Sequence, residues 1–179
     1  MTVDCPLDCE YLREARKHEK LPQPDPEAEP DRDIRVTESF LRENEPLAVY
    51  LARALTSAAL GVPGGADVDV RDALAALVQT FRTLQSGVVY ASRPENPRAA
   101  AIFEAAQTAV PEFRKLEEQE LGLARTRDSD VLGILVFLRR LAAANDNGRP
   151  RGRAFLDLMW EAYGGGAPPP RPASSLILP

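Results

Sequence analysis

The chain has 179 residues, which suits a single domain with residues left over at its ends. Its formal net charge of −5 excludes the basic footprint of a nucleic-acid-binding protein, and no apolar run approaches the roughly 20 residues of a membrane span. The composition is 44% hydrophobic but only 6% aromatic, and its Ala and Leu content favours helices over sheets.

Residues 1–20 predict an N-terminal helix. Pro6 suits the first helical position, with Asp4 or Cys5 at the cap before it. The apolar side chains that share one face of this helix are Leu7, Tyr11, Leu12 and Ala15. The opening residues have neither the basic nor the apolar segment of a signal peptide, so we expect a cytoplasmic protein whose thiols are reduced.

Cys5 and Cys9 have the chemistry of metal ligands or redox thiols. At a spacing of four they share a helix face about 6 Å apart, which suits two thiolate ligands better than a disulfide. The nearby helix N-terminus favours the thiolate form. His18, the only histidine, lies on the opposite face. A zinc or iron–sulfur site would therefore need a second copy of the pair or carboxylate ligands. The alternative is that both thiols are packed or idle.

Residues 21–36 predict a Pro-rich acidic linker. Pro22, Pro24 and Pro26 alternate with other residues and exclude a helix. As polyproline II, the 21–33 segment would span about 40 Å, so the N-terminal helix could dock at a distance. Residues 1–33 hold ten acids and five bases, whereas the remaining residues hold 17 of each. The sequence thus predicts an acidic arm joined to a neutral body.

Residues 37–163 predict the helical bundle domain. Its first long helix begins near Pro46 and ends at Gly61. We expect Asp67 or Asp69 to cap the next helix, whose apolar residues recur in alternating steps of four and three. These residues are Val70, Leu74, Leu77, Phe81, Leu84 and Val88.

Three further helices complete the predicted bundle. Asn96 is the expected cap of a helix that runs from Pro97 to about Arg125, with a kink at Pro111. The stretch from Val131 to Leu138 is apolar on all sides, which suits the central helix of a bundle. The side chains of the last helix that we expect to face inward are Phe155, Leu158, Met159 and Ala162.

Residues 164–179 predict an extended, Gly/Pro-rich tail with an apolar tip. The tip residues are Leu176, Ile177 and Leu178. A short apolar tip at the end of a linker is typical of a docking peptide. The predicted fold is therefore all-α: a bundle of about five helices, with an N-terminal helix on a Pro-rich tether and an extended C-terminal tail.

Arg149, Arg151 and Arg153 alternate in the loop before the last helix, with Arg139 and Arg140 upstream. Guanidinium groups next to a helix N-terminus favour anion binding, because both present N–H donors to the same ligand. The alternative is that these arginines pair with acids of the same fold.

Catalytic signatures are sparse. A Ser–His–Asp arrangement would have to use His18, and the chain has neither a Walker phosphate loop nor a Gly-x-Gly-x-x-Gly motif. These absences argue against an enzyme. The leading hypothesis is a non-catalytic interaction or accessory protein, which binds a protein partner or a second copy of itself through its two arms. The expected contact residues are Leu7, Tyr11, Leu12, Leu176, Ile177 and Leu178.

Two alternatives stay open. The first is a small metal-binding or thiol-redox protein that uses Cys5 and Cys9, possibly shared across a dimer. The second is a helical regulator that binds a small molecule beside Phe81, Phe103 and Phe137, although a filled aromatic core has the same sequence pattern.

Overall fold

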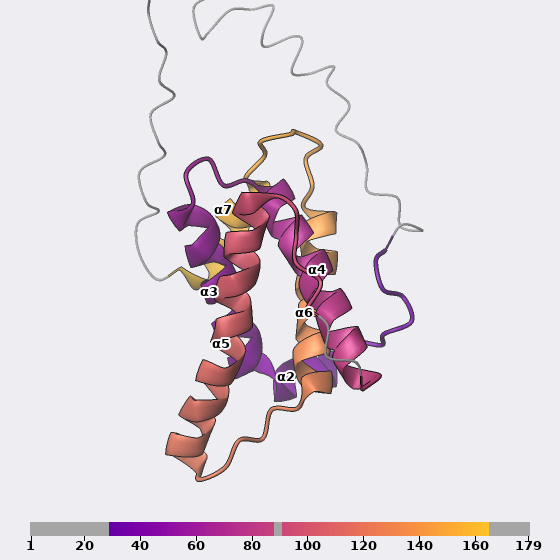
Figure 1. The fold of residues 1–179 in the computed structure, drawn as a ribbon, viewed down its shortest axis with the longest axis vertical. Coiled ribbons are helices and arrows are strands. Elements are labelled where there is room, and N and C mark those ends of the chain that lie inside the picture. Colours follow the sequence, from indigo (N-terminus) through magenta and orange to yellow (C-terminus); the bar gives the residue numbers. More distant parts are fainter. Residues whose placement is uncertain (1–28, 88–90, 165–179) are drawn as a thin grey trace, which may run out of the picture.

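The computed structural model describes residues 29–87 and 91–164, and all regular secondary structure in these residues is helical. The helices are α2 (Glu38–Glu43), α3 (Glu45–Gly61), α4 (Asp67–Gln85), α5 (Pro97–Leu121), α6 (Asp128–Ala144) and α7 (Ala154–Tyr163) (Figure 1). The predicted all-α bundle is thereby confirmed. Within the described ranges, no helix combines the length and apolarity needed to cross a membrane.

The four long helices form two pairs that pack on each other. One pair is α4 with α6 and the other is α3 with α5, while α7 packs against α3. Figure 1 shows the two pairs on opposite sides of the bundle. The largest fully buried side chains between them include Leu51, Val70, Leu74, Leu77, Phe103, Ile134 and Leu138. The apolar run from Val131 to Leu138 therefore lies in the core, as the sequence predicts.

Helices α4 and α5 begin at the same end of the bundle (Figure 1). The chain between them must therefore return along the length of α4 before α5 can start. The Ser92 N–H donates to Thr80 Oγ1 at 3.0 Å, which holds the returning chain against α4. Asn96 Nδ2 then donates to Asp69 Oδ1 at 2.7 Å, which joins the first turns of the two helices.

Capping residues in the sequence predicted several helix ends correctly. Asn96 caps α5 by accepting the Arg98 N–H at 3.0 Å. Helix α5 continues through Pro111 and ends before Gly122, whose φ of 79° is left-handed. It therefore stops at Leu121, earlier than the predicted Arg125, because glycine adopts this terminating conformation without strain.

The predicted inward face of the last helix was wrong in part. Phe155 and Met159 are buried as expected, but Leu158 is 38% exposed and Ala162 is also exposed. Leu156, which the prediction left out, is buried. Helix α7 is short and packs mainly against one neighbour, α3, so only a narrow stripe of its side chains is covered.

A close approach fixes the position of α2. The ring of Phe40 lies over Gly133 in the middle of α6, and a Cβ on Gly133 would be 2.5 Å from Phe40 Cζ. Glycine therefore leaves the space that the ring occupies. Phe40 is partly buried and packs against the core.

Residues 29–36, which we call the acidic segment, lie against α4 and α6. Arg82 of α4 donates to Asp31 Oδ1 at 2.9 Å and to both carboxylate oxygens of Asp33 at 2.6 and 2.7 Å. Arg139 of α6 donates to Asp31 Oδ2 at 2.6 Å. Asp31 is thus held between two guanidinium groups. This part of the predicted linker belongs to the packed body of the protein.

Arg140 binds the backbone of the acidic segment. Its guanidinium donates to the carbonyl oxygens of Pro30, Asp31 and Ile34 at 3.1, 2.7 and 2.9 Å. Ile34 and Val36 also pack against the core. The acidic segment therefore covers the outer face of the α4–α6 pair, and Arg139 and Arg140 are engaged there.

We predict that Asp31→Asn weakens this contact. Asparagine tolerates the left-handed backbone of Asp31, whose φ is 57°, but it lacks the charge that pairs with Arg82 and Arg139. The free energy of unfolding should fall by about 1 kcal/mol in urea denaturation, since these ion pairs are partly buried. The control is Glu43→Gln on exposed α2, and equal losses in both variants would contradict the prediction.

Candidate functional site

Asp67 joins the first turns of α4 and α7. Its carboxylate accepts the Phe155 N–H at 3.1 Å and the Leu156 N–H at 3.0 Å. Its own N–H donates to the Gly152 carbonyl at 2.9 Å. The expectation that Asp67 caps α4 was therefore wrong, because its side chain supplies acceptors to the amides of another helix, which lies far along the chain.

The carboxylate of Asp69 accepts hydrogen bonds at the start of its own helix, α4. Its Oδ2 accepts the Ala66 N–H at 3.0 Å, and its Oδ1 accepts Asn96 Nδ2. Asp69 was the other predicted cap of α4, and it does bind the chain at that helix start. Together with Asp67, it places the N-termini of α4, α5 and α7 at one end of the bundle. We call this the N-terminal end of the bundle.

Burial raises the pKa of Asp67, which is only 4% exposed. Hydrogen bonds from the Leu156 and Phe155 backbone, together with the charge of Arg71, act in the opposite direction and do not cancel this effect. The buried carboxylate loses its hydration, and hydrogen bonds from the first amides of α7 replace part of it.

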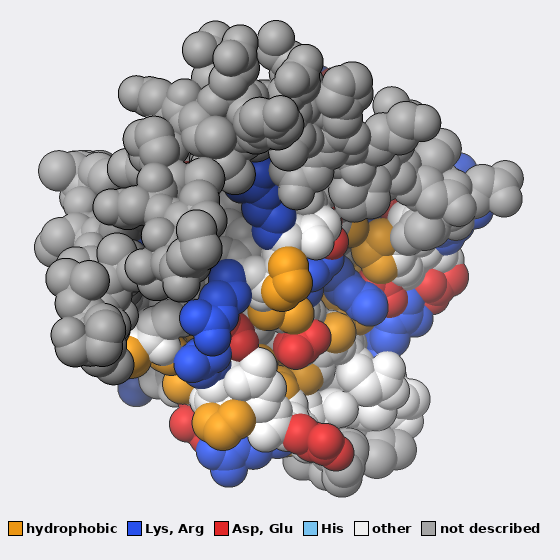
Figure 2. Space-filling model, turned by 90° about the horizontal axis from the view of Figure 1, so that it is seen from above, with side chains coloured by type: hydrophobic (Ala, Val, Ile, Leu, Met, Phe, Trp, Pro, Cys, Tyr) orange, Lys and Arg blue, Asp and Glu red, His pale blue; other side chains and the backbone are white. Residues whose placement is uncertain are grey.

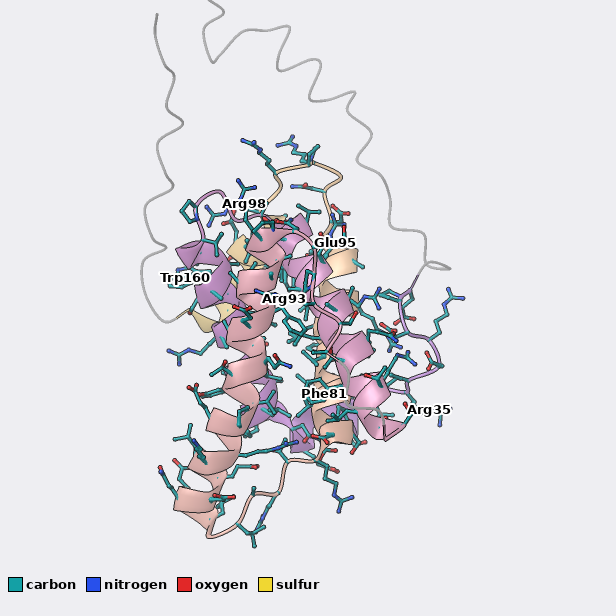
Figure 3. The ribbon with its side chains drawn as sticks, viewed as in Figure 1. Arg35, Phe81, Arg93, Glu95, Arg98 and Trp160 are labelled. Carbon is teal, nitrogen blue, oxygen red and sulfur yellow. The ribbon has the colours of Figure 1, made fainter. Side chains whose placement is uncertain are left out.

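Two of the three predicted anion-binding arginines lie on a cavity at this end. Arg151 and Arg153 line a volume of about 540 Å³ together with residues 59–66, which close α3 and lead into α4. Arg98, labelled in Figure 3, lies beside the same loop, with Nη2 at 3.5 Å from the position of a Cβ on Gly64. Figure 2, which views this end, shows Arg and Lys side chains among acidic and apolar ones.

Arg149 has a different position. It does not line this cavity, and its carbonyl accepts the Gly152 N–H at 2.9 Å. Its backbone therefore helps to turn the loop that presents Arg151 and Arg153. Arg139 and Arg140, upstream in the sequence, bind the acidic segment.

A second recess, the α3–α5 groove, lies on the outer face of that pair and has a volume of about 760 Å³. It is lined by Pro46, Val49, Tyr50, Arg53, Ala54, Ser57, Ala58, Ala105, Ala109 and Glu112. The rings of Tyr50 and Phe113 are in tilted contact, with centroids 5.2 Å apart and an interplanar angle of 53°. This groove could not be predicted from the sequence, since small residues at helical spacing also fit a packed interface.

Arg53 lies between the groove and a smaller cavity. This cavity has a volume of about 240 Å³, and its lining includes Trp160 and Gly164 (Figure 3 labels Trp160). Arg53 and Ser57 line both recesses. The described chain ends at Gly164, which lines the smaller cavity.

The remaining predicted site residues lie outside the described residues. They are Cys5, Cys9, Leu7, Tyr11, Leu12, Leu176, Ile177 and Leu178. The zinc or iron–sulfur site therefore stays a prediction. Within residues 29–87 and 91–164, no group of three or more His, Cys, Asp or Glu side chains is arranged to hold a metal ion. Phe81 and Phe103 are buried in the core, and Phe137 packs against it.

No protein-family model matches the chain, and no curated protein or solved structure is significantly similar to it. The function has to be inferred from the groove, the cavity and the charges around them.

We predict that Asp67→Ala destabilises the fold by about 2 kcal/mol, because the buried amides of Phe155 and Leu156 lose their acceptors. Urea denaturation measures this loss. Asp72→Ala is the matched control, since Asp72 is exposed on the same helix, and it should change stability by less than about 0.5 kcal/mol. Similar values for the two variants would show that Asp67 is not a cap.

The raised pKa of Asp67 predicts a pH dependence. A carboxyl whose folded-state pKa exceeds its unfolded value of about 3.9 stabilises the fold most below that pH. This stabilisation is lost as pH rises through the folded-state pKa. The unfolding free energy of the wild type minus that of Asp67→Asn should therefore decrease between about pH 4 and pH 7. An increase over this range would mean that the fold favours the ionised form.

Proposed function

We propose that this chain is a non-catalytic interaction or accessory protein whose bundle receives an amphipathic helix in the α3–α5 groove. The observation that supports this function is the unequal covering of the two helix pairs. The acidic segment covers the outer face of α4 and α6, whereas no described residue covers the α3–α5 groove. An apolar recess between two helices is a common seat for a third helix.

The groove has the spacing that such a helix requires. Its α5 side consists of Ala105, Ala109 and Glu112, and small residues such as Ala54 and Ala58 line its α3 side. Small side chains let a third backbone approach closely. The predicted helix of residues 5–20 offers a matching stripe of larger side chains, namely Leu7, Tyr11 and Leu12.

The groove carries one charge of each sign. Arg53 and Glu112 both line it, and Glu112 Oε2 accepts the hydroxyl of Tyr50, which precedes Arg53 by about one turn of α3, at 3.5 Å. The predicted N-terminal helix carries both acids, such as Glu10, and bases, such as Lys17, so each charge of the groove has an opposite charge on this helix.

The reach of the arm favours a groove on a second copy. Because the acidic segment is held on α4 and α6, only residues 21–28 can act as the tether, which gives about 25 Å. The path around the bundle from the α4–α6 side to the α3–α5 side is half its circumference, which is about 30 Å for a bundle two helices wide. This path is longer than the tether even before the length of the groove is added. The length of the tether does not limit binding when the helix comes from a second copy or from a partner with a similar helix.

The C-terminal tip is a second candidate for the same groove. The described chain ends at Gly164, and the cavity that Gly164 lines shares Arg53 with the groove. Residues 165–176 in a Pro-rich extended form would reach about 35 Å, which is enough to place Leu176, Ile177 and Leu178 anywhere along it. Experiments on the groove should therefore compare both arms.

We predict that Ala105→Glu prevents occupation of the groove, because it places an unpaired charge where an apolar stripe would be buried. A labelled peptide of residues 1–20 should bind the 29–179 chain at least about tenfold more weakly after this change. Ala101→Glu is the matched control, since Ala101 is exposed one turn earlier on α5 and does not line the groove. Native mass of the full chain, from light scattering, shows whether the arm joins two copies.

The outcomes separate the possible occupants. A dimer that Ala105→Glu converts to a monomer supports binding between copies. Competition by a peptide of residues 172–179 would assign the groove to the tail instead. Equal peptide binding by the wild type, Ala105→Glu and Ala101→Glu would refute the groove as a docking surface.

A further inference from the structure

The cavity lined by Arg151 and Arg153 has no place in the proposed helix binding, because no residue lines both this cavity and the α3–α5 groove. We call it the arginine cavity. It combines two cations with an apolar wall that includes Leu60, Val62 and Pro63. A volume of about 540 Å³ is within the range of sites for small organic ligands.

One donor of these two arginines lacks an acceptor. The Nε atom of Arg153 is buried and has no hydrogen-bond partner. Arg82, in contrast, meets two carboxylates in the acidic segment. Arg151 is exposed and lines the cavity, so its guanidinium is accessible to an oxyanion there.

Two buried acids at this end of the bundle bind elsewhere. Asp67 is committed to the amides of α7, and Asp69 is committed to Ala66 and Asn96. The N-termini of α4 and α7 add positive potential at the same end. The carbonyls at the end of α3 offset part of it, but Arg98 adds a further positive charge beside Gly64.

The loop at the cavity depends on glycine. Gly64 has a φ of 74°, and a Cβ on Gly65 would overlap the carbonyl oxygen of Ala59. These two glycines let the chain turn tightly between α3 and α4 in the loop that lines the cavity.

We propose that the arginine cavity binds a small organic phosphate, with Arg151 and Arg153 on the phosphoryl oxygens and the 59–66 loop against the organic part. Arginine presents paired N–H donors that match phosphate geometry, and two such groups suit a dianion. The apolar wall favours an organic phosphate over the free ion, which would leave that wall without contacts.

The test is isothermal titration of the full chain with phenyl phosphate and with inorganic phosphate, at constant ionic strength. We expect one saturable site for phenyl phosphate and weaker binding of inorganic phosphate. Arg151→Gln/Arg153→Gln should lower the affinity for phenyl phosphate at least about tenfold. The matched control is Arg35→Gln/Arg125→Gln, which removes the same two charges from exposed positions that do not line the cavity. It should stay within about twofold of the wild type.

Each remaining outcome is decisive. Equal weakening in both double variants, or no saturable binding by the wild type, would overturn the proposal. If inorganic phosphate binds as tightly as phenyl phosphate, the site takes the free ion and the organic part of the proposal is wrong. If the double variant unfolds, Arg151→Gln alone decides, because Arg151 is exposed, and an unchanged affinity would count against the site. Binding of the 1–20 peptide should be unaffected, which separates this proposal from the helix groove.

Discussion

The backbone amides at one end of the bundle set the main constraint on this fold. Helices α4, α5 and α7 all begin there, and the first amides of a helix have no partner within it. Parallel neighbours such as α4 and α5 also place like ends of their dipoles together. The buried carboxylates of Asp67 and Asp69 supply acceptors for these amides and negative charge beside the dipoles. Asp67 accepts from the first turn of α7, and Asp69 accepts from the start of α4 and from Asn96, which caps α5. The packing of α7 and the position of α5 depend on these two side chains.

Arginine has two different roles in this structure. Arg82, Arg139 and Arg140 bind an acidic segment of the same chain, and this contact attaches residues 29–36 to the α4–α6 pair. Arg151 and Arg153 instead line a cavity at the N-terminal end of the bundle. The N-terminal part of the chain carries an excess of acids, and α4 and α6 take up part of it.

Periodicity and local capping predicted the helices but not the contacts between distant residues. The heptad spacing from Val70 to Phe81 and the Asn96 cap depend on neighbours in sequence, and both are confirmed. The partner of Asp67 could not be predicted, because a carboxylate can cap its own helix or another with the same sequence pattern. The inward face of α7 was partly wrong for a similar reason, since one neighbour covers fewer side chains than a full bundle does. Of the predicted arginines, two line a cavity, and only three-dimensional packing distinguishes them from Arg149.

The attachment of the acidic segment also bears on the order in which the chain folds. Asp31 contacts Arg139, so this contact closes one of the longest loops in the described structure. A contact of this kind forms late, because the entropy of closing the loop must be met before the ion pairs contribute. During synthesis, residues 29–36 emerge before α4 and α6, yet their binding surface is complete only after α6 has been made and has packed on α4. We therefore expect the acidic segment to dock late in folding, after α4 and α6 have packed together.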